Sequence, residues 1–378
     1  MLAETGFVGD REDQGGTMAS RLTAVQAGKK AARVTISDVA TALDMTKSTV
    51  SRALNGYPDI AKATRIRVER MAEQLNYRPL SSAQAIRTGR TRSLGFVLQL
   101  ADHDAMRPFL AEFLAGLSAG ASADGYTLTV ASADCADNVA ETFEGLVRDG
   151  KADGFVLPRA LVDDPRVAQL SAAQVPFVLY GRPQNPADCC WFDVRGEDAM
   201  TSAVQRLHAL GHQRIAFING GSIYEYARLR YEGYCAGMAA VGLPVDPELV
   251  LSDAVQIEAG EAAAHQLFSL PQPPTAIVCA VDLAALGVYR AAANRGLVVG
   301  RDVSVIGYDG IPDGAHVTPQ LSTFCVDNRN AGQRLASLLI RCIRGEDPED
   351  LRETATATFV DRGSIGPARP AGLSKVSI

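Results

Sequence analysis

Short apolar runs that alternate with helical stretches dominate residues 93–310, and they limit the folds open to this chain. The first run, "SLGFVLQL", is followed by a predicted helix over about 107–124 and then by "YTLTVA"; the later runs are "DGFVLP", "VPFVLYGR", "RIAFING", "TAIVCAVD" and "DVSVIGYDG". Strands that are apolar along their whole length are typical of parallel sheets covered by helices on both faces. Because about 270 residues keep this rhythm, we predict an α/β body of two similar lobes.

The first 92 residues differ from this body in charge. They hold 15 Lys and Arg against 9 Asp and Glu, whereas the rest of the chain holds 22 against 34. The net charge of the whole chain is −6, yet its N-terminal part is basic. A basic segment on an acidic body is typical of a protein that meets a polyanion at one end.

Within this basic part, the sequence predicts three short helices. Ser37 and Thr46 are candidate caps of the first two, and Asn55-Gly56 is a natural end for the second, over 47–54. A third helix is expected from about residue 63. The apolar positions at helical spacing are Ile36, Val39, Ala40, Leu43, Val50, Ala53, Leu54, Val68, Met71, Ala72 and Leu75. Two short helices joined by a tight turn and closed by a third predict a helix-turn-helix unit.

Four blocks in this region, "VTISDVA", "STVSRALNG", "NYRP" and "IRTGRTRSLGFV", stand in the order and spacing of a known family. The chain closely resembles the LacI/GalR family of bacterial transcription regulators, whose DNA-binding head carries these blocks. In the body, "LGHQRIAFING", "PPTAIVCAVDLAALGVYRA", "GRDVSVIGYD" and "PQLSTF" are similar to the family's periplasmic-binding-protein-like effector domain. For the head alone, a three-helix bundle that contacts another protein is the alternative.

The resemblance implies an α-helical helix-turn-helix head and an α/β two-lobed, periplasmic-binding-protein-like body with parallel sheets. The expected segments are a disordered extension (1–33), a helix-turn-helix domain (34–79), a hinge helix and linker (80–92), an effector-binding and dimerisation domain of two lobes (93–364) and a tail (365–378). The chain is expected to cross between the lobes near residues 190–195, 323–327 and 350–356.

In this family the second helix lies in the major groove of DNA, which makes Lys47, Ser48 and Arg52 the expected base-reading residues. Arg and Lys can pair with the acceptors of guanine, and a serine hydroxyl can serve either base edge. Short side chains that can bond to phosphates complete the expected DNA-binding set on this helix: Thr46, Thr49, Ser51 and Asn55. For Thr49 and Ser51 the alternative is an ordinary helix surface or a capping role.

The start of the third helix departs from the family pattern. The family's third helix normally begins with a Ser cap, but this chain has Ala61 there, and Asp59 is the candidate substitute.

Residues 81–87 can form only about two helical turns, too few to be stable alone in water. By resemblance they form a hinge helix on DNA, where Ile86 replaces the family's Leu as an apolar wedge between base pairs. The alternative is that Ile86 anchors the linker to the body.

Open α/β sheets bind ligands at the carboxyl ends of their strands. By resemblance, the effector-binding residues expected there are Phe109, Arg182, Tyr224, Tyr226, Arg230 and Asp282. An Arg–Asp pair flanked by aromatic rings suits a polyhydroxylated ligand, because the charged groups bond to hydroxyls and the rings stack on sugar faces. The stretches "YGRPQNP" and "WFDV" resemble regulators of sugar uptake, particularly of α-glucosides.

Several of these assignments have alternatives. Asp282 is also a candidate helix cap, Tyr226 is a candidate for a place outside the cleft, and Trp191 is a candidate core residue at the hinge between the lobes. The family often has Asp-Asn after the fourth strand, where this chain has Arg195-Gly196. Asp193 is then the candidate for that role, and the alternative is that the contacts at the hinge differ from those of the family.

No catalytic motif stands out. The chain has no Gly-rich phosphate loop, GxSxG or HExxH motif, and its five His residues are dispersed. The seven Cys residues include no CxxC pair and form no cluster with zinc spacing, so we expect reduced thiols, no metal and no cofactor. The N-terminus lacks a signal-peptide pattern, and no apolar stretch approaches the roughly 18 residues of a membrane span. We therefore expect a cytoplasmic protein that is not an enzyme.

Together these features predict a sequence-specific transcriptional regulator, a repressor controlled by a small sugar or glycoside. Two heads must read two half-sites of double-stranded operator DNA, so a homodimer is expected. One alternative, a solute-binding protein, leaves the head unexplained. The other, a sugar-modifying enzyme, lacks an acid/base pair. The sequence leaves open whether the effector releases or tightens DNA.

Overall fold

The computed structural model describes residues 34–78, 89–99, 110–133, 137–186 and 189–369. The chain divides into two compact units, Met1–Ile86 and Arg87–Ile378. Two of the predicted site residues, Ile86 and Phe109, lie outside the described residues. None of the described helices combines the length and the apolar character needed to cross a membrane.

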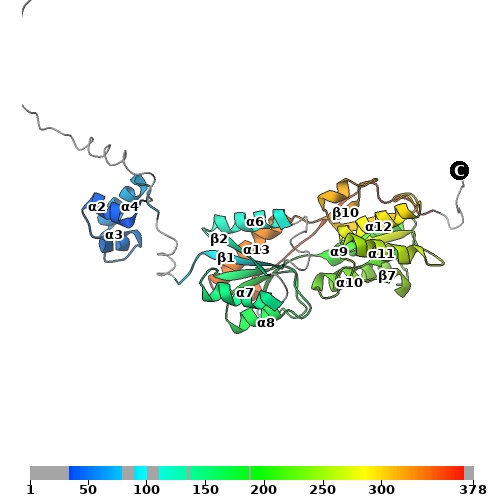
Figure 1. The fold of residues 1–378 in the computed structure, drawn as a ribbon, viewed down its shortest axis with the longest axis horizontal. Coiled ribbons are helices and arrows are strands. Elements are labelled where there is room, and N and C mark those ends of the chain that lie inside the picture. The colour runs from blue at the N-terminus through cyan, green and yellow to red at the C-terminus, as the bar shows by residue number, and fades with distance from the viewer. Residues whose placement is uncertain (1–33, 79–88, 100–109, 134–136, 187–188, 370–378) are drawn as a thin grey trace, which may run out of the picture. The chain divides into compact units, whose positions relative to one another are not determined.

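Three helices pack around a small apolar core in the first unit (Figure 1). They are α2 (Ile36–Leu43), α3 (Lys47–Leu54) and α4 (Lys62–Gln74). The buried core residues are Val39, Ala40, Leu43, Val50, Ala53 and Val68, all at positions that the sequence predicted to be apolar stripes. The predicted helix-turn-helix unit is confirmed.

The ends of these helices show which local predictions were right. Thr35, not the predicted Ser37, precedes α2, and its N–H donates to Asp38 Oδ2 over 2.7 Å. Thr46 caps α3 as predicted, because its Oγ1 accepts from Thr49 N–H at 3.1 Å. Ala61 precedes α4 without a side-chain cap bond. The expected substitute, Asp59, instead forms an ion pair with Arg52.

The second unit contains two six-stranded sheets. The first has the order β11-β5-β4-β3-β1-β2, with parallel pairing throughout. Its strands are β1 (Ser93–Gln99), β2 (Thr127–Ala133), β3 (Gly154–Leu157), β4 (Phe177–Tyr180), β5 (Cys190–Val194) and β11 (Arg352–Ala355).

The second sheet has the order β12-β10-β9-β8-β6-β7, and within it β12 pairs antiparallel with β10. Its strands are β6 (Ile215–Ile218), β7 (Val250–Leu251), β8 (Ala276–Cys279), β9 (Ser304–Asp309), β10 (Ser322–Cys325) and β12 (Thr358–Val360). Both sheets consist mostly of parallel strands, as the apolar runs predicted.

Helices cover both faces of each sheet (Figure 1). Around the first sheet lie α6 (Leu110–Ala123), α7 (Asp137–Arg148), α8 (Pro165–Ala172) and α13 (Asn328–Ile343). Around the second lie α9 (Gly196–Ala209), α10 (Glu225–Ala240), α11 (Ile257–Phe268) and α12 (Asp282–Asn294). Short 3₁₀ turns are η2 (Pro247–Leu249), η3 (Pro312–Ala315) and η4 (Pro348–Asp350). The helices α6 and α13 pack so closely that a Cβ atom at Gly332 would lie 2.4 Å from Phe113 O.

Three crossings of the chain join the two lobes. They lie between β5 and α9, between β10 and α13, and between β11 and β12. In sequence these are residue 195, residues 326–327 and residues 356–357, close to the predicted positions. The carboxyl ends of the parallel strands of both lobes therefore meet around one cleft, which is the place where open α/β sheets bind ligands.

Candidate functional site

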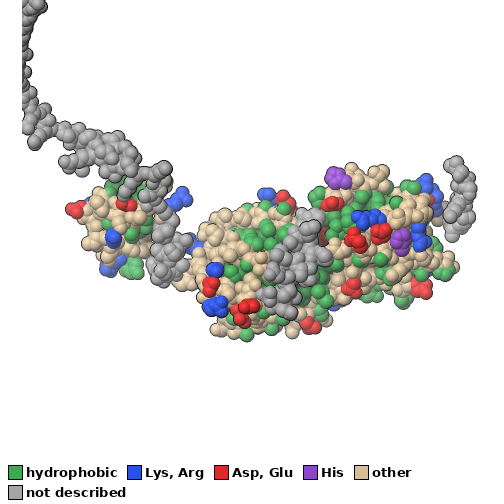
Figure 2. All heavy atoms as spheres, viewed as in Figure 1, with side chains coloured by type: hydrophobic (Ala, Val, Ile, Leu, Met, Phe, Trp, Pro, Cys, Tyr) green, Lys and Arg blue, Asp and Glu red, His purple; other side chains and the backbone are tan. Residues whose placement is uncertain are grey.

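The surface of α3 carries the residues that the sequence assigned to base reading. Lys47, Ser48 and Arg52 are exposed, whereas Val50 and Ala53 on the opposite side are buried in the core. Next to these residues lie four side chains that form hydrogen bonds with one another: Thr46, Thr49, Ser51 and Asn55. Figure 2 shows acidic and basic side chains on the three-helix unit and on the two-lobed unit.

The short polar residues of α3 bond to one another. Thr46 Oγ1 and Thr49 Oγ1 lie 2.9 Å apart, and Asn55 Nδ2 donates to Ser51 Oγ over 3.3 Å. These bonds fix the start and the end of the helix. Each hydroxyl oxygen has further bonding capacity, so a capping role and a phosphate contact are compatible.

Arg52 is held in place within the head. Its guanidinium forms an ion pair with Asp59 and lies 5.5 Å from the centre of the Tyr57 ring. Both charged side chains are about half exposed, at 47%, so the pair contributes little to stability. The ion pair does hold the Arg52 guanidinium near the end of α3. To contact a base, Arg52 would have to leave Asp59.

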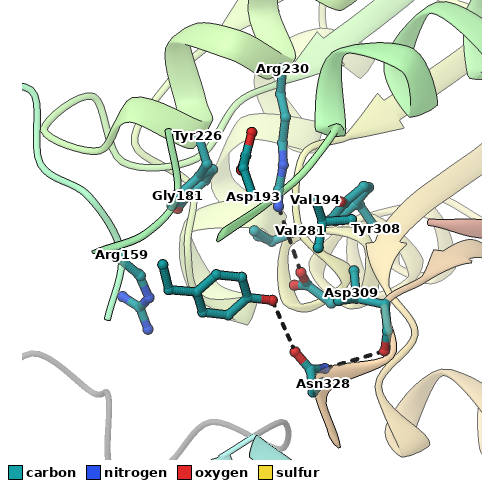
Figure 3. Close-up of a pocket in the computed structure, with 12 residues that line it drawn as sticks. Arg159, Gly181, Asp193, Val194, Tyr226, Arg230, Val281, Tyr308, Asp309 and Asn328 are labelled. Carbon is teal, nitrogen blue, oxygen red and sulfur yellow. Dashed lines mark hydrogen bonds and ion pairs between the residues drawn. The ribbon is translucent and has the colours of Figure 1, made fainter. Parts of the chain in front are cut away.

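A pocket lies between the lobes of the second unit, at the carboxyl ends of strands from both sheets (Figure 3). The first lobe contributes Arg159, Tyr180, Gly181, Asp193 and Val194. The second lobe and the second crossing contribute Tyr226, Arg230, Val281, Tyr308, Asp309, Val326 and Asn328. Of the predicted effector-binding residues, the structure brings Tyr226 and Arg230 into this lining.

Arg230 is the centre of the pocket. The side chain is buried on α10, and its guanidinium carbon lies 4.5 Å from the centre of the Tyr226 ring and 3.8 Å from that of Tyr308. Nη1 donates to Ala280 O, and Nη2 lies 4.0 Å from Asp309 Oδ1. Burial opposes the charge of Arg230, but the surrounding Tyr and Asp groups outweigh it and raise its pKa. A cation between aromatic faces is therefore a fixed part of the site.

Asp193 supplies a buried acceptor on the opposite, first-lobe side. It is only 6% exposed, and its Oδ2 has no hydrogen-bond partner among the described residues. The nearest cation, Arg182 Nε, lies 3.7 Å from that oxygen. Burial raises the pKa of Asp193 to about 6, although Arg182 opposes the shift. Because unpaired buried acceptors are costly, a ligand hydroxyl that donates to Oδ2 would bind here with a gain.

Asp282 lies behind the pocket, outside its lining. Its side chain is fully buried at the start of α12, where Oδ2 accepts from the N–H groups of Gly310 and Ile311 and Oδ1 accepts from Thr323 Oγ1. Burial, with the nearby Asp309 carboxylate, raises the pKa of Asp282 to about 7. The carboxylate thus ties α12 to β10 and to the turn after β9. In this position it supports Asp309, which lines the pocket.

The remaining predicted residues lie next to the pocket. Arg182 Nη2 donates to Glu197 Oε1 over 2.6 Å, so the positive charge of Arg182 is balanced by this carboxylate. Tyr224 precedes α10 and stacks on Tyr226, with ring centres 5.4 Å apart. Both residues hold side chains that line the pocket.

The lining residues that were absent from the predicted effector-binding set include Arg159, Asp309 and Asn328. Arg159 follows β3, Asp309 ends β9 and Asn328 begins α13, where its Oδ1 accepts from Tyr180 over 3.4 Å. The sequence signal for Arg159 and Asp309 is their place directly after an apolar run. Asn328 carries no such signal, because its place depends on how the second crossing re-enters the first lobe.

Within the described residues, no three His, Cys, Asp or Glu side chains are grouped in a way that could hold a metal ion. The pocket instead offers aromatic faces, one buried guanidinium and carboxylate oxygens. This set can bind hydroxyl groups and stack on the faces of rings.

A helix-turn-helix unit joined to a two-lobed fold with a ligand-type cleft defines a class of protein, the ligand-responsive DNA-binding regulators. A family model described as bacterial regulatory proteins of the lacI family matches residues 35–80, and a periplasmic binding protein-like domain matches residues 204–365. The HTH-type transcriptional regulator AglR of Rhizobium meliloti (strain 1021) is 35% identical over 89% of this chain and 95% of its own. The regulator RafR of Escherichia coli is 32% identical over 86% and 97%.

Solved structures of transcriptional regulators have the same fold as this chain. The transcriptional regulator CelR in complex with cellobiose is 28% identical, with a TM-score of 0.68 over 88% of this chain and all of that one. The Lac repressor dimer bound to operator, at 24% identity, shares the fold with a TM-score of 0.72. This chain belongs to the LacI family of bacterial regulatory proteins. It is a DNA-binding transcriptional regulator, and its relatives are regulators rather than enzymes.

Proposed function

We propose that this protein is a cytoplasmic repressor that binds operator DNA as a homodimer and responds to a small, neutral, sugar-like effector in the cleft. The observation that carries the effector proposal is the placement of Arg230 between two Tyr rings, in a pocket that is also lined by Asp193, whose Oδ2 has no hydrogen bond within the described residues. Aromatic rings bind the apolar faces of sugars, and fixed charged groups bond to their hydroxyls.

The charges of the pocket favour a neutral ligand. The lining holds two guanidinium groups, from Arg159 and Arg230, and two carboxyl groups, from Asp193 and Asp309. With both carboxyl groups ionised these charges cancel, so a sugar phosphate or a sugar acid would bring an unbalanced charge into a partly buried site. A neutral glycoside meets no such penalty, and α-glucosides remain our first choice.

On the DNA side, we assign base reading to Lys47, Ser48 and Arg52, with phosphate contacts from Thr46, Thr49, Ser51 and Asn55. The exposure of Thr46, Lys47, Ser48 and Arg52 supports this assignment, and Thr49, Ser51 and Asn55 are half-buried on the same capped helix or at its end. Ile86 as the minor-groove wedge and Phe109 as a pocket wall remain assignments by family resemblance. For Asp282 we propose an indirect role, through the turn that carries Asp309.

The proposal is tested by measuring the unfolding temperature of the full-length protein with neutral mono- and disaccharides, among them maltose, sucrose, trehalose and cellobiose, and with glucose 6-phosphate and glucuronate. We expect at least one neutral sugar to raise the unfolding temperature of the wild type but not of Arg230→Ala. Stabilisation by the anionic compounds alone, or equal stabilisation of both proteins, would contradict it.

A further inference from the structure

The two lobes are joined by paired backbone segments at the edge of the pocket. Val162 N–H of the first lobe donates to Ile223 O of the second over 3.0 Å, and Glu225 N–H donates to Ala160 O over 3.0 Å. Between these bonds, Leu161 and Tyr224 form an antiparallel bridge. We call residues 159–162 and 223–225 together the clasp.

Side chains add two links to the clasp. Glu225 is 1% exposed, and its Oε1 accepts from the N–H of Gln184 in the first lobe over 2.8 Å. The guanidinium carbon of Arg159 lies 5.2 Å from the centre of the Tyr224 ring. Among the described residues, the clasp thus consists of three hydrogen bonds and one cation–π pair, and the bond from Arg182 to Glu197 Oε1 is a further link between the lobes. Each of these contacts is a single polar or cation–π contact that can break and form again.

Each half of the clasp is shaped by its own lobe. On the first-lobe side, the buried Arg166 donates to Pro158 O at 3.1 Å and to Arg159 O at 2.9 Å, and it pairs with Asp164. On the second-lobe side, Asp253 Oδ1 accepts from both N–H and Oγ of Ser222. Because these bonds stay within a lobe, the two halves can separate and meet again without refolding.

The clasp is continuous with the pocket through stacked side chains. Arg159 covers Tyr224, the ring of Tyr224 stacks on Tyr226 at 15°, and Tyr226 covers Arg230. Figure 3 shows Arg159 and Arg230 on opposite sides of the pocket, with Tyr226 near Arg230. A change in the position of Tyr226 is therefore passed to Tyr224, which lies in the clasp itself.

We propose that the clasp is a reversible closure that sets the balance between open and closed cleft, and that Arg159 and Tyr224 are the positioning residues that connect this balance to the pocket. A group bound against Tyr226 stabilises the stack only in the closed arrangement, so it favours closure by its difference in affinity for the two states. This inference concerns the lobes and holds whether or not the ligand is a sugar.

Hydrogen–deuterium exchange of the full-length protein without ligand tests the clasp, by following the segments 160–164 and 222–226. We expect slow exchange in the wild type, because the Val162 and Glu225 amides are bonded across the lobes. Arg159 has a φ of 50°, so Arg159→Asn removes the cation while keeping a residue that tolerates this backbone. It should speed exchange in both segments about two- to fivefold, the effect of one exposed cation–π pair.

A second variant and a control separate closure from general loosening. Val162→Pro removes one hydrogen bond between the lobes at an exposed residue and should speed exchange of 222–226. Arg206→Ala removes a guanidinium that lies 4.2 Å from the Phe359 ring inside the second lobe, and it should leave both segments unchanged. Complete exchange of the wild-type segments at the earliest time point, or wild-type rates in both clasp variants, would overturn the proposal. Since no ligand is present, either result leaves the proposed effector untouched.

Discussion

The guanidinium carbon of Arg230 lies 3.8 Å from the centre of the Tyr308 ring, deep in the cleft between the lobes. The two residues come from different elements, α10 and β9, and the stacking fixes the plane of the guanidinium. Its Nε has no hydrogen-bond partner among the described residues. The pair thus places a rigid, buried guanidinium in the lining of the cleft.

The planar shape of Arg230 is the first property to test. Arg230→Lys keeps the positive charge but loses the stacked fork, and Arg and Lys are not equivalent at such sites. We expect binding of the sugar found in the thermal screen to weaken about 10- to 100-fold by calorimetry, a loss of about 1.4–2.8 kcal/mol. Operator binding without sugar should stay near wild type. Unchanged sugar affinity would show that the charge alone is used, or that the ligand lies elsewhere.

Asp282 should behave as a structural residue. Asp282→Ala leaves two backbone N–H groups and the Thr323 hydroxyl without their acceptor. Each orphaned buried group costs about 1–3 kcal/mol, so we expect urea denaturation to give a free energy of unfolding lower by about 3 kcal/mol. Full stability combined with complete loss of sugar binding would instead show that the carboxylate reaches the ligand.

The buried carboxyl group of Asp193 predicts a pH dependence. Burial raises its pKa to about 6, above the ordinary value of an aspartate, so the folded state binds the proton more tightly than the unfolded state. The stabilisation is complete below pH 4 and is lost as the pH rises through about 6, by roughly 3 kcal/mol. Asp193→Asn stays neutral throughout. The difference in unfolding free energy between this variant and the wild type should therefore grow between pH 4 and 7 in favour of the variant, and a constant difference would contradict the shift.

Arg52 should contribute to sequence discrimination. Arg52→Ala is expected to weaken binding to the preferred operator by about 1–3 kcal/mol and to relax the choice at one base position, with little change on random DNA. Arg70→Ala, on the exposed side of α4, is the matched control for loss of one positive charge. Fluorescence anisotropy on both DNAs gives the comparison. An equal loss on operator and random DNA would reduce Arg52 to a phosphate contact.

Much of the fold follows from local sequence signals. The bounds of α3 were predicted because Thr46 caps its start and Gly56, with a φ of 71°, ends it. The strands were predicted because a parallel strand buried on both faces must be apolar throughout. Even so, the cap of α2 was misplaced, since Ser37 and Thr35 are both good caps and the sequence alone does not choose between them.

The pocket was less predictable, because its residues come from different crossings and loops. Tyr226 and Arg230 share one face of α10, so family resemblance was enough to bring them together. Asp282 looked equivalent in sequence, but the turn after β9 folds over it, and its carboxylate accepts from Gly310, Ile311 and Thr323 within the protein. Asn328 reaches the site only because α13 returns to the first lobe.

The central claim, that a neutral ligand in the cleft controls operator binding, is tested most directly by one titration. Operator affinity of the full-length protein is measured with and without the sugar found in the thermal screen, for the wild type and for Arg230→Lys. We predict that the sugar changes the wild-type operator affinity at least about tenfold, and that the variant needs a 10- to 100-fold higher sugar concentration for the same change. A wild-type affinity that the bound sugar leaves unchanged, or the same response in both proteins, would contradict the account.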